Sequence, residues 1–121
     1  MPNDEKLEKL IRLLIRGTTE GKIQWEYGNV PRSRIHGTDE VIEEYFTTTF
    51  KEQEIAVFER RYKGFDAENE ATYWTSAECI GFVANGEITW ETDRQPLLSN
   101  LFRVAKESAA DVDGIIDSLL K

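Results

Sequence analysis

Residues 71–90, ATYWTSAECIGFVANGEITW, are the stretch that decides the fold. Residues 71–84 are rich in β-branched and aromatic side chains, which favour a long extended segment. Asn85-Gly86 follows, and this dipeptide between two alternating apolar runs favours a type I′ turn. We therefore predict a β-hairpin that joins residues 82–84 to residues 87–90. Within its first strand, Gly81 indicates a bulge or a close approach of backbone.

Three stretches upstream of this hairpin are also predicted to be strands. Ile23, Trp25 and Tyr27 alternate with polar residues, as in a half-buried strand. Residues 45–51 contain three consecutive threonines, and a further strand begins at Ile55 and runs to Lys63. Turns are expected at residues 51–54 and 64–69. Residues 38–44 are ambiguous, because Thr38 can cap a short helical turn there.

Both ends of the chain carry apolar residues at helical spacing. An N-terminal helix is expected to be capped by Asn3 or Asp4 and to end between Gly17 and Gly21. A C-terminal helix opens near Pro96 and is expected to bend or break near 108–114, where Asp111 can serve as a second cap. The apolar stripes comprise Leu7, Leu10, Ile11 and Leu14, then Leu97, Leu98, Leu101, Phe102 and Ala105, then Val112, Ile115, Ile116, Leu119 and Leu120.

These patterns predict an α+β fold in a single domain, residues 1–121. It comprises an N-terminal helix, a four- to five-stranded antiparallel sheet and the C-terminal helix, with the helices on one face of the sheet. Trp25 and Trp90 are expected in the core under the two helices. A chain of this length buries a sufficient core without a metal or a disulfide.

Charge and cysteine content indicate which partners and which cellular compartment to expect for the protein. The chain has 23 acidic and 15 basic residues, a formal net charge of -8. An acidic surface repels a phosphate backbone, so no direct nucleic-acid binding is expected. A single cysteine suits a reducing compartment, and no apolar run approaches the length of a membrane span. We expect a cytoplasmic protein without a secretory signal or a membrane contact.

Three short motifs carry a resemblance to other proteins. They are residues 21–25 (GKIQW), residues 85–88 (NGEI) and the Leu98, Leu101, Phe102 step. In these motifs and their order the chain resembles a group of short bacterial proteins of unassigned function that have a helix–antiparallel sheet–helix layout. The resemblance implies a bacterial setting, such as a plasmid, phage or genomic island. It implies no activity and no catalytic residue.

The sequence contains no constellation to which a reaction can be assigned. Cys79 and His36 are the one thiol and the one imidazole, and they lie far apart in the chain. The strand around Cys79 predicts a buried thiol that packs as a small apolar side chain. A zinc site needs clustered Cys and His ligands, and a calcium loop needs regularly spaced acids. We therefore predict no catalytic residue, no metal site and no cofactor.

Basic residues nevertheless form two clusters in this acidic chain, and they are the candidate site for a phosphate-bearing ligand or an acidic partner. The alternative, which we favour, is local pairing with Glu40, Glu43, Glu44 or Glu59. The candidate binding residues are Arg32, Arg34, His36, Arg60 and Arg61.

Residues 71–84 are apolar on both faces of their strand, whereas two terminal helices cover only one face of a sheet. We therefore expect a non-enzymatic protein-interaction module, immunity- or inhibitor-like or regulatory, that forms a homodimer through the sheet face or binds a basic protein. The alternative is a small-ligand binder or weak enzyme that uses a concave sheet face and the basic loop. A pocket joining that loop to Trp25 or Tyr45 would favour the alternative.

Overall fold

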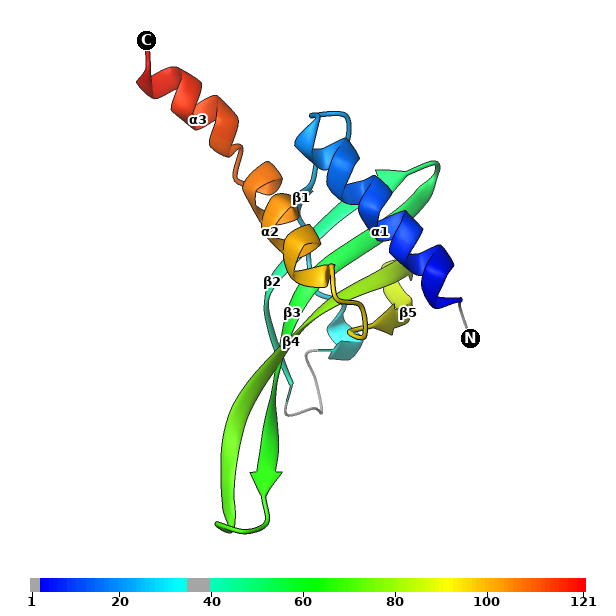
Figure 1. The fold of residues 1–121 in the computed structure, drawn as a ribbon, viewed down its shortest axis with the longest axis vertical. Helices are drawn as coiled ribbons and strands as arrows, with labels where there is room; N and C mark the ends of the chain where they lie inside the picture. The colour runs from blue at the N-terminus through cyan, green and yellow to red at the C-terminus, as the bar shows by residue number, and fades with distance from the viewer. Residues whose placement is uncertain (1–2, 35–39) are drawn as a thin grey trace.

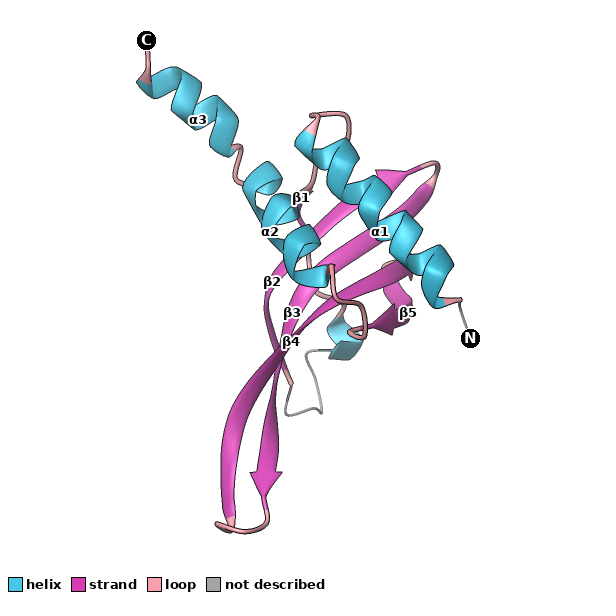
Figure 2. Ribbon diagram, in the orientation of Figure 1, coloured by secondary structure: helices cyan, strands magenta, loops and turns pink. Residues whose placement is uncertain are grey.

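The computed structural model describes residues 3–34 and 40–121 and confirms the α+β class (Figure 2). The five strands form an antiparallel sheet in the order β1-β2-β3-β4-β5, so that each strand pairs with its neighbours in sequence. The elements are α1 (Asp4–Thr19), β1 (Glu26–Tyr27), a 3-10 turn η1 (Arg32–Arg34), β2 (Val41–Phe50), β3 (Gln53–Asp66), β4 (Ala71–Ala84), β5 (Glu87–Thr92), α2 (Leu98–Ala109) and α3 (Val112–Leu119).

Helix α1 begins and ends where the sequence predicts. The Asn3 side chain accepts hydrogen bonds from the backbone N–H groups of Glu5 (2.8 Å) and Lys6 (3.3 Å), and so satisfies two unpaired donors of the first turn. After Thr19 the chain reverses at Gly21, whose φ of 77° lies in the left-handed region.

Two tight hairpins set the register of the sheet. Asn85 and Gly86 have φ values of 54° and 77°, as a type I′ turn requires, and pair Ala84 with Glu87. The β2–β3 turn at Lys51 and Glu52 also has two positive φ values, 49° and 70°. The close approach of backbone expected at Gly81 is present. The pairing of β4 with β5 also shifts between Phe82 and Val83, and the extra residue there is Thr89 of β5. A β-carbon on Gly81 would lie 3.0 Å from the Trp90 carbonyl oxygen.

The strand predicted around Trp25 is shorter than expected. Only Glu26 and Tyr27 pair with β2. The Trp25 backbone N–H donates to Ser108 Oγ at the end of α2 (2.9 Å), and its indole N–H donates to Thr18 Oγ1 (2.9 Å). These bonds hold Trp25 at the helices rather than in the sheet. Of the ambiguous stretch 38–44, residues 41–44 are strand, and residues 38 and 39 lie outside the described residues.

Strands β3 and β4 extend further than the sequence predicts. β3 continues past Lys63 to Asp66, and the turn occupies residues 67–70 instead of 64–69. Asp66 Oδ1 accepts from the Glu68 N–H (3.0 Å), and Asp66 Oδ2 accepts from the Asn69 side chain (2.7 Å), which closes this turn. Beyond the ends of β2 and β5, residues 62–66 and 71–75 pair with each other and, among the described residues, with no other strand. They form a ribbon that projects from the body (Figure 1). We call residues 62–75 the arm.

One face of the sheet carries the main core, under α1 and α2 (Figure 1). Ile11, Leu14 and Leu101 are fully buried there against Phe46 and Val57 of the sheet. Trp25 is buried in this core, and Trp90 packs against it in a partly buried position. Burying each such side chain contributes roughly 1.5–3 kcal/mol before the loss of conformational entropy is counted.

The second face of the sheet has its own, smaller core. It consists of Tyr45, Ala56, Phe58, Cys79 and Val83, all at most 4% exposed. Val30, Ile42 and Ile88 pack against it. The chain therefore covers both faces of β4 near the body, one with helices and the other in part with its own segment around Val30.

The C-terminal helical region is broken, as the sequence predicts. α2 ends at Ala109, and Asp111 at the N-cap position of α3 has a left-handed φ of 52°. Its side chain makes no capping hydrogen bond, contrary to the expected role, and lies against Gly114, where a β-carbon would clash with the carboxylate. α3 then leads away from the body and has no buried residue (Figure 1).

Candidate functional site

The predicted basic site lies on the second face of the sheet. After buried Pro31, the turn η1 places Arg34 over this face, with its guanidinium carbon 5.9 Å from the centre of the Phe58 ring. Ser33 Oγ donates to Glu87 Oε2 (2.6 Å), which ties the same turn to β5. The turn is therefore fixed to the sheet by polar contacts as well as by packing.

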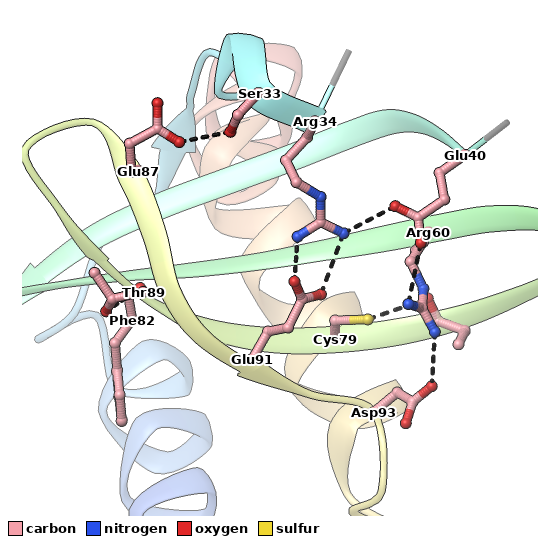
Figure 3. A network of polar contacts seen from close by, with 11 residues as sticks. Ser33, Arg34, Glu40, Arg60, Cys79, Phe82, Glu87, Thr89, Glu91 and Asp93 are labelled. Carbon is pink, nitrogen blue, oxygen red and sulfur yellow. Dashed lines mark hydrogen bonds and ion pairs between the residues drawn. The ribbon is translucent and has the colours of Figure 1, made fainter. Parts of the chain in front are cut away.

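Two arginines and three carboxylates form a chain of ion pairs here (Figure 3). Arg34 pairs with Glu91 and, at 3.0 Å, with Glu40. Glu40 also accepts from Arg60 (3.1 Å), which in turn donates to Asp93 (3.2 Å). Burial lowers the pKa of Arg34, but the hydrogen bonds to Glu91 and Glu40 outweigh it, so this pKa lies above its ordinary value. The guanidinium groups are thus engaged within the chain.

The guanidinium groups that the sequence suggests as a phosphate anchor are paired with carboxylates in this network. An incoming anion would meet three carboxylates beside two guanidinium groups, and it would have to displace hydrogen bonds to charged partners. Of the five predicted residues, the network brings together Arg34 and Arg60. Arg61 points from the opposite side of β3 and pairs with Glu43 at 3.3 Å, and Arg32 is exposed. His36 lies outside the described residues. Local pairing, the favoured alternative, therefore describes Arg34, Arg60 and Arg61.

Cys79 lies beside this network, beneath the ion pairs. Its side chain is 1% exposed, and burial raises the pKa of the thiol to about 12. Burial likewise raises the pKa of the neighbouring Tyr45 phenol to about 12. A thiol nucleophile must be ionised to attack, so Cys79 is held in its unreactive form at neutral pH.

A groove that the sequence did not predict opens between the end of α1, residues 20–26 and the end of β2. It has a volume of about 800 Å³. Trp25, Ile23 and Phe50 supply apolar lining, while Arg16, Lys22 and Lys51 contribute positive charges. Of the predicted basic residues, the four that the structure describes, Arg32, Arg34, Arg60 and Arg61, do not line it. The groove arises because residues 20–25, which connect α1 to β1, form no strand pairing with β2. The Thr48 side chain of β2 reaches them through a hydrogen bond to the Gln24 carbonyl oxygen. No pattern in the sequence predicts this path of the chain.

The largest exposed apolar surface on a helix belongs to α3. Its stripe was recognised in the sequence, but it was expected to pack on the sheet as the α2 stripe does. The exposed side chains are Val112 (37%), Ile115 (53%), Ile116 (47%), Leu119 (78%) and Leu120 (80%). In a soluble domain such a contiguous patch marks a contact surface.

The arm carries a second set of exposed aromatic residues. Trp74 is 50% exposed and has Lys63 Nζ 5.3 Å and the Arg61 guanidinium 5.9 Å from its ring centre. Phe65 is 63% exposed. On the other face of the ribbon, Tyr73 lies against Gly64, where a β-carbon would clash with the ring. The length of β3 and β4 beyond their neighbours produces this surface.

Comparison with known proteins gives no information on the function of this chain. The chain matches no protein-family model, no curated protein and no solved structure. Over the described residues, the helices are too short or too polar to cross a bilayer. No group of three or more His, Cys, Asp or Glu side chains arranged to hold a metal ion occurs within residues 3–34 and 40–121.

Proposed function

We propose that this protein is a non-enzymatic protein-interaction module and that α3 and the arm are its contact surface. The observation that carries the proposal is the stripe of exposed apolar side chains on α3. A helix of eight residues gains little stability in water from its own hydrogen bonds. Its apolar face would gain much more by burial against another protein, in the manner of an amphipathic helix that docks in a groove.

The arm supports the same function. A two-stranded ribbon without further strands or a covering helix is only marginally stable in water. Trp74, flanked by Arg61 and Lys63, has the composition of an interface anchor, because tryptophan and arginine are enriched among the residues that dominate binding energy. The second face of the body is less suited to this role, since Val30 and Arg34 already cover part of it.

The net charge of -8 adds a preference for the partner. A basic protein surface would be steered toward this chain at low ionic strength. An inhibitory or immunity-like role against such a protein is a form of the same function.

The groove beside Trp25 supports a second candidate function, the binding of a small ligand. Its volume of about 800 Å³ lies in the range of ligand sites, and it combines an apolar lining with a few polar groups. Leu13 lines this groove and is 48% exposed, so that it can be changed without disturbing the core.

Affinity capture with two matched variants tests the function. Leu119→Asp alters the α3 stripe and Leu13→Asp alters the groove, and both positions are exposed. Immobilised wild type is expected to retain a protein from a lysate of the source organism, and the retained protein is then purified. Its affinity is expected to fall about tenfold or more with Leu119→Asp, or about 1.4 kcal/mol, and to be unchanged with Leu13→Asp. If no retained protein, and no second copy of the chain, binds in a way that depends on α3 or the arm, the proposal is wrong.

A further inference from the structure

We propose that α3 of one copy of this chain packs on the arm of a second copy, in a two-fold dimer in which each copy contributes both elements. The inference rests on the proposed function, because it takes α3 and the arm as the contact surface and names a second copy as their partner. Three observations support it: the position of the two elements, the residues that share one face of the arm, and the order of charges along both.

The position of the two elements favours a reciprocal contact, in which α3 of each copy packs on the arm of the other. α3 and the arm project from opposite ends of the body along its longest axis, so they do not meet within one chain (Figure 1). A half-turn about an axis across the molecule brings the arm of the second copy alongside α3 of the first, and the reverse contact follows by symmetry. One operation thus covers both exposed surfaces.

The strand register places suitable residues on one face of the arm. Lys63 pairs with Trp74, and Phe65 pairs with Thr72. Partner residues in antiparallel strands point to the same side, so Phe65, Lys63 and Trp74 share a face with Arg61. This is the face that α1 and α2 cover further along the sheet, where Val57 and Ile80 pair. The arm therefore continues the helix-binding face of the sheet without a helix on it.

When α3 lies along the partner's arm from its base to its tip, acidic residues of α3 lie opposite basic residues of the arm. Asp113 and Asp117 lie four residues apart, on one side of α3, and Lys121 follows two residues after the helix ends at Leu119. Asp113 and Asp117 are separated by about 6 Å along a helix axis. Arg61 and Lys63 are separated by about 6.6 Å along a strand, so the two spacings agree. The ion pair of Arg61 with Glu43 lies at the surface, where Asp113 of the second copy would join or replace it.

Beyond Lys63 the arm becomes acidic toward its tip, at Asp66, Glu68 and Glu70. Lys121, two residues beyond the end of α3, lies on the side of this acidic tip in the same alignment. The half-turn described above produces this direction, because α3 and the partner's arm then both point away from the centre of the dimer. Direct pairing of α3 with a second α3 would leave Phe65 and Trp74 of both arms exposed, whereas the arrangement proposed here covers α3 and the arm together.

Single-cysteine crosslinking tests the contact in the full chain. Leu119→Cys and Phe65→Cys change exposed positions, and the native Cys79 is buried with an un-ionised thiol. Each variant is oxidised alone and in an equal mixture. A covalent dimer that forms only in the mixture is expected. A dimer formed equally by either variant alone, or no dimer in any sample, would overturn the inference.

A charge exchange provides an independent measurement by sedimentation velocity. Lys63→Glu and Asp117→Lys each place like charges in contact across the interface and are expected to weaken self-association about tenfold. The double variant is expected to restore it. A strictly monomeric wild type, or a double variant as weak as the single ones, contradicts the dimer. If the wild type is monomeric but still retains another protein through α3, the proposed function stands and the second-copy inference is wrong.

Discussion

Arg34 shows how one residue fastens a loop to a sheet. Arg34 links η1 to β5 through its ion pair with Glu91, and to the residue before β2 through its ion pair with Glu40. Its guanidinium carbon also lies 5.9 Å from the centre of the Phe58 ring. Its side chain is only 18% exposed, so these ion pairs are less screened by water than ordinary surface pairs. These ion pairs hold η1 in place over Tyr45 and Phe58.

Replacing Arg34 by alanine is therefore expected to destabilise the protein. Hydrogen bonds to charged groups contribute about 1.5–3 kcal/mol, and Glu91 would lose its partner. Urea denaturation should show a loss of this order in the free energy of unfolding. Arg32→Ala, two residues away and exposed, is the matched control and should change it by less than about 0.5 kcal/mol. Equal losses in the two variants would contradict the role of Arg34.

Cys79 leads to a prediction about pH. The folded thiol has a pKa of about 12 because it is buried, against an ordinary value of 9.0. Between these values the unfolded chain releases the thiol proton and the folded chain keeps it. The unfolded state then binds fewer protons, so the free energy of unfolding falls as pH rises from about 9 toward 12.

Chemical denaturation at a series of alkaline pH values measures this effect. Cys79→Ala removes the thiol and should flatten the slope, even though its stability is lower at every pH. Tyr45→Phe should flatten it separately above pH 10, because the pKa of the Tyr45 phenol is raised from 10.0 to about 12. An unchanged slope in Cys79→Ala would rule out the buried thiol as a cause.

At the scale of elements, α2 and α3 have the same kind of apolar stripe and different surroundings. Leu101 of α2 is fully buried between the sheet and α1, while Leu119 of α3 is 78% exposed. The difference comes from the break at residues 110 and 111, where Asp111 takes a left-handed conformation and redirects the chain. Periodicity alone describes a helix face, and it does not say whether anything covers that face.

The two leucines provide a paired test of this difference. Leu101→Ala is expected to lower the free energy of unfolding by about 2–5 kcal/mol, because it removes buried methyl groups and leaves a cavity. Leu119→Ala should change it by less than about 0.5 kcal/mol at protein concentrations where the chain is monomeric. Thermal and urea denaturation measure both changes. A small loss in Leu101→Ala, or a large loss in Leu119→Ala, would contradict the assigned positions of these side chains.

At the scale of the whole molecule, the body and its two projections depend on different contacts. The body has a core on each face of the sheet. α3 and the arm extend from it in opposite directions with large apolar side chains exposed (Figure 1). The body is therefore expected to fold without α3, whereas assembly is expected to require it.

Truncation after Ala110 tests that division. The near-ultraviolet circular dichroism of the tryptophans should be preserved, because Trp25 and Trp90 pack in the main core. The Tm of the wild type should rise with protein concentration, since association stabilises the folded state, and that dependence should disappear in the truncated chain. Loss of the near-ultraviolet signal on truncation would show that α3 is part of the core.

The sequence by itself determined the order of helices and strands, a helix cap at Asn3 or Asp4, the Asn85-Gly86 hairpin, the break after α2 and the burial of Cys79. Each of these depends on residues close in the chain, through a turn, a cap or a side-chain period. The sequence also placed basic residues near acidic ones without saying which would pair.

Only the tertiary structure decided that Arg34 and Arg60 meet at Glu40, that residues 20–26 leave a groove, and that the arm and α3 stay uncovered. These features depend on how far each strand extends past its neighbours and on which surface finds a partner within the chain. Local patterns do not specify such contacts, because the same apolar stripe is stable against the sheet of its own chain or against another molecule.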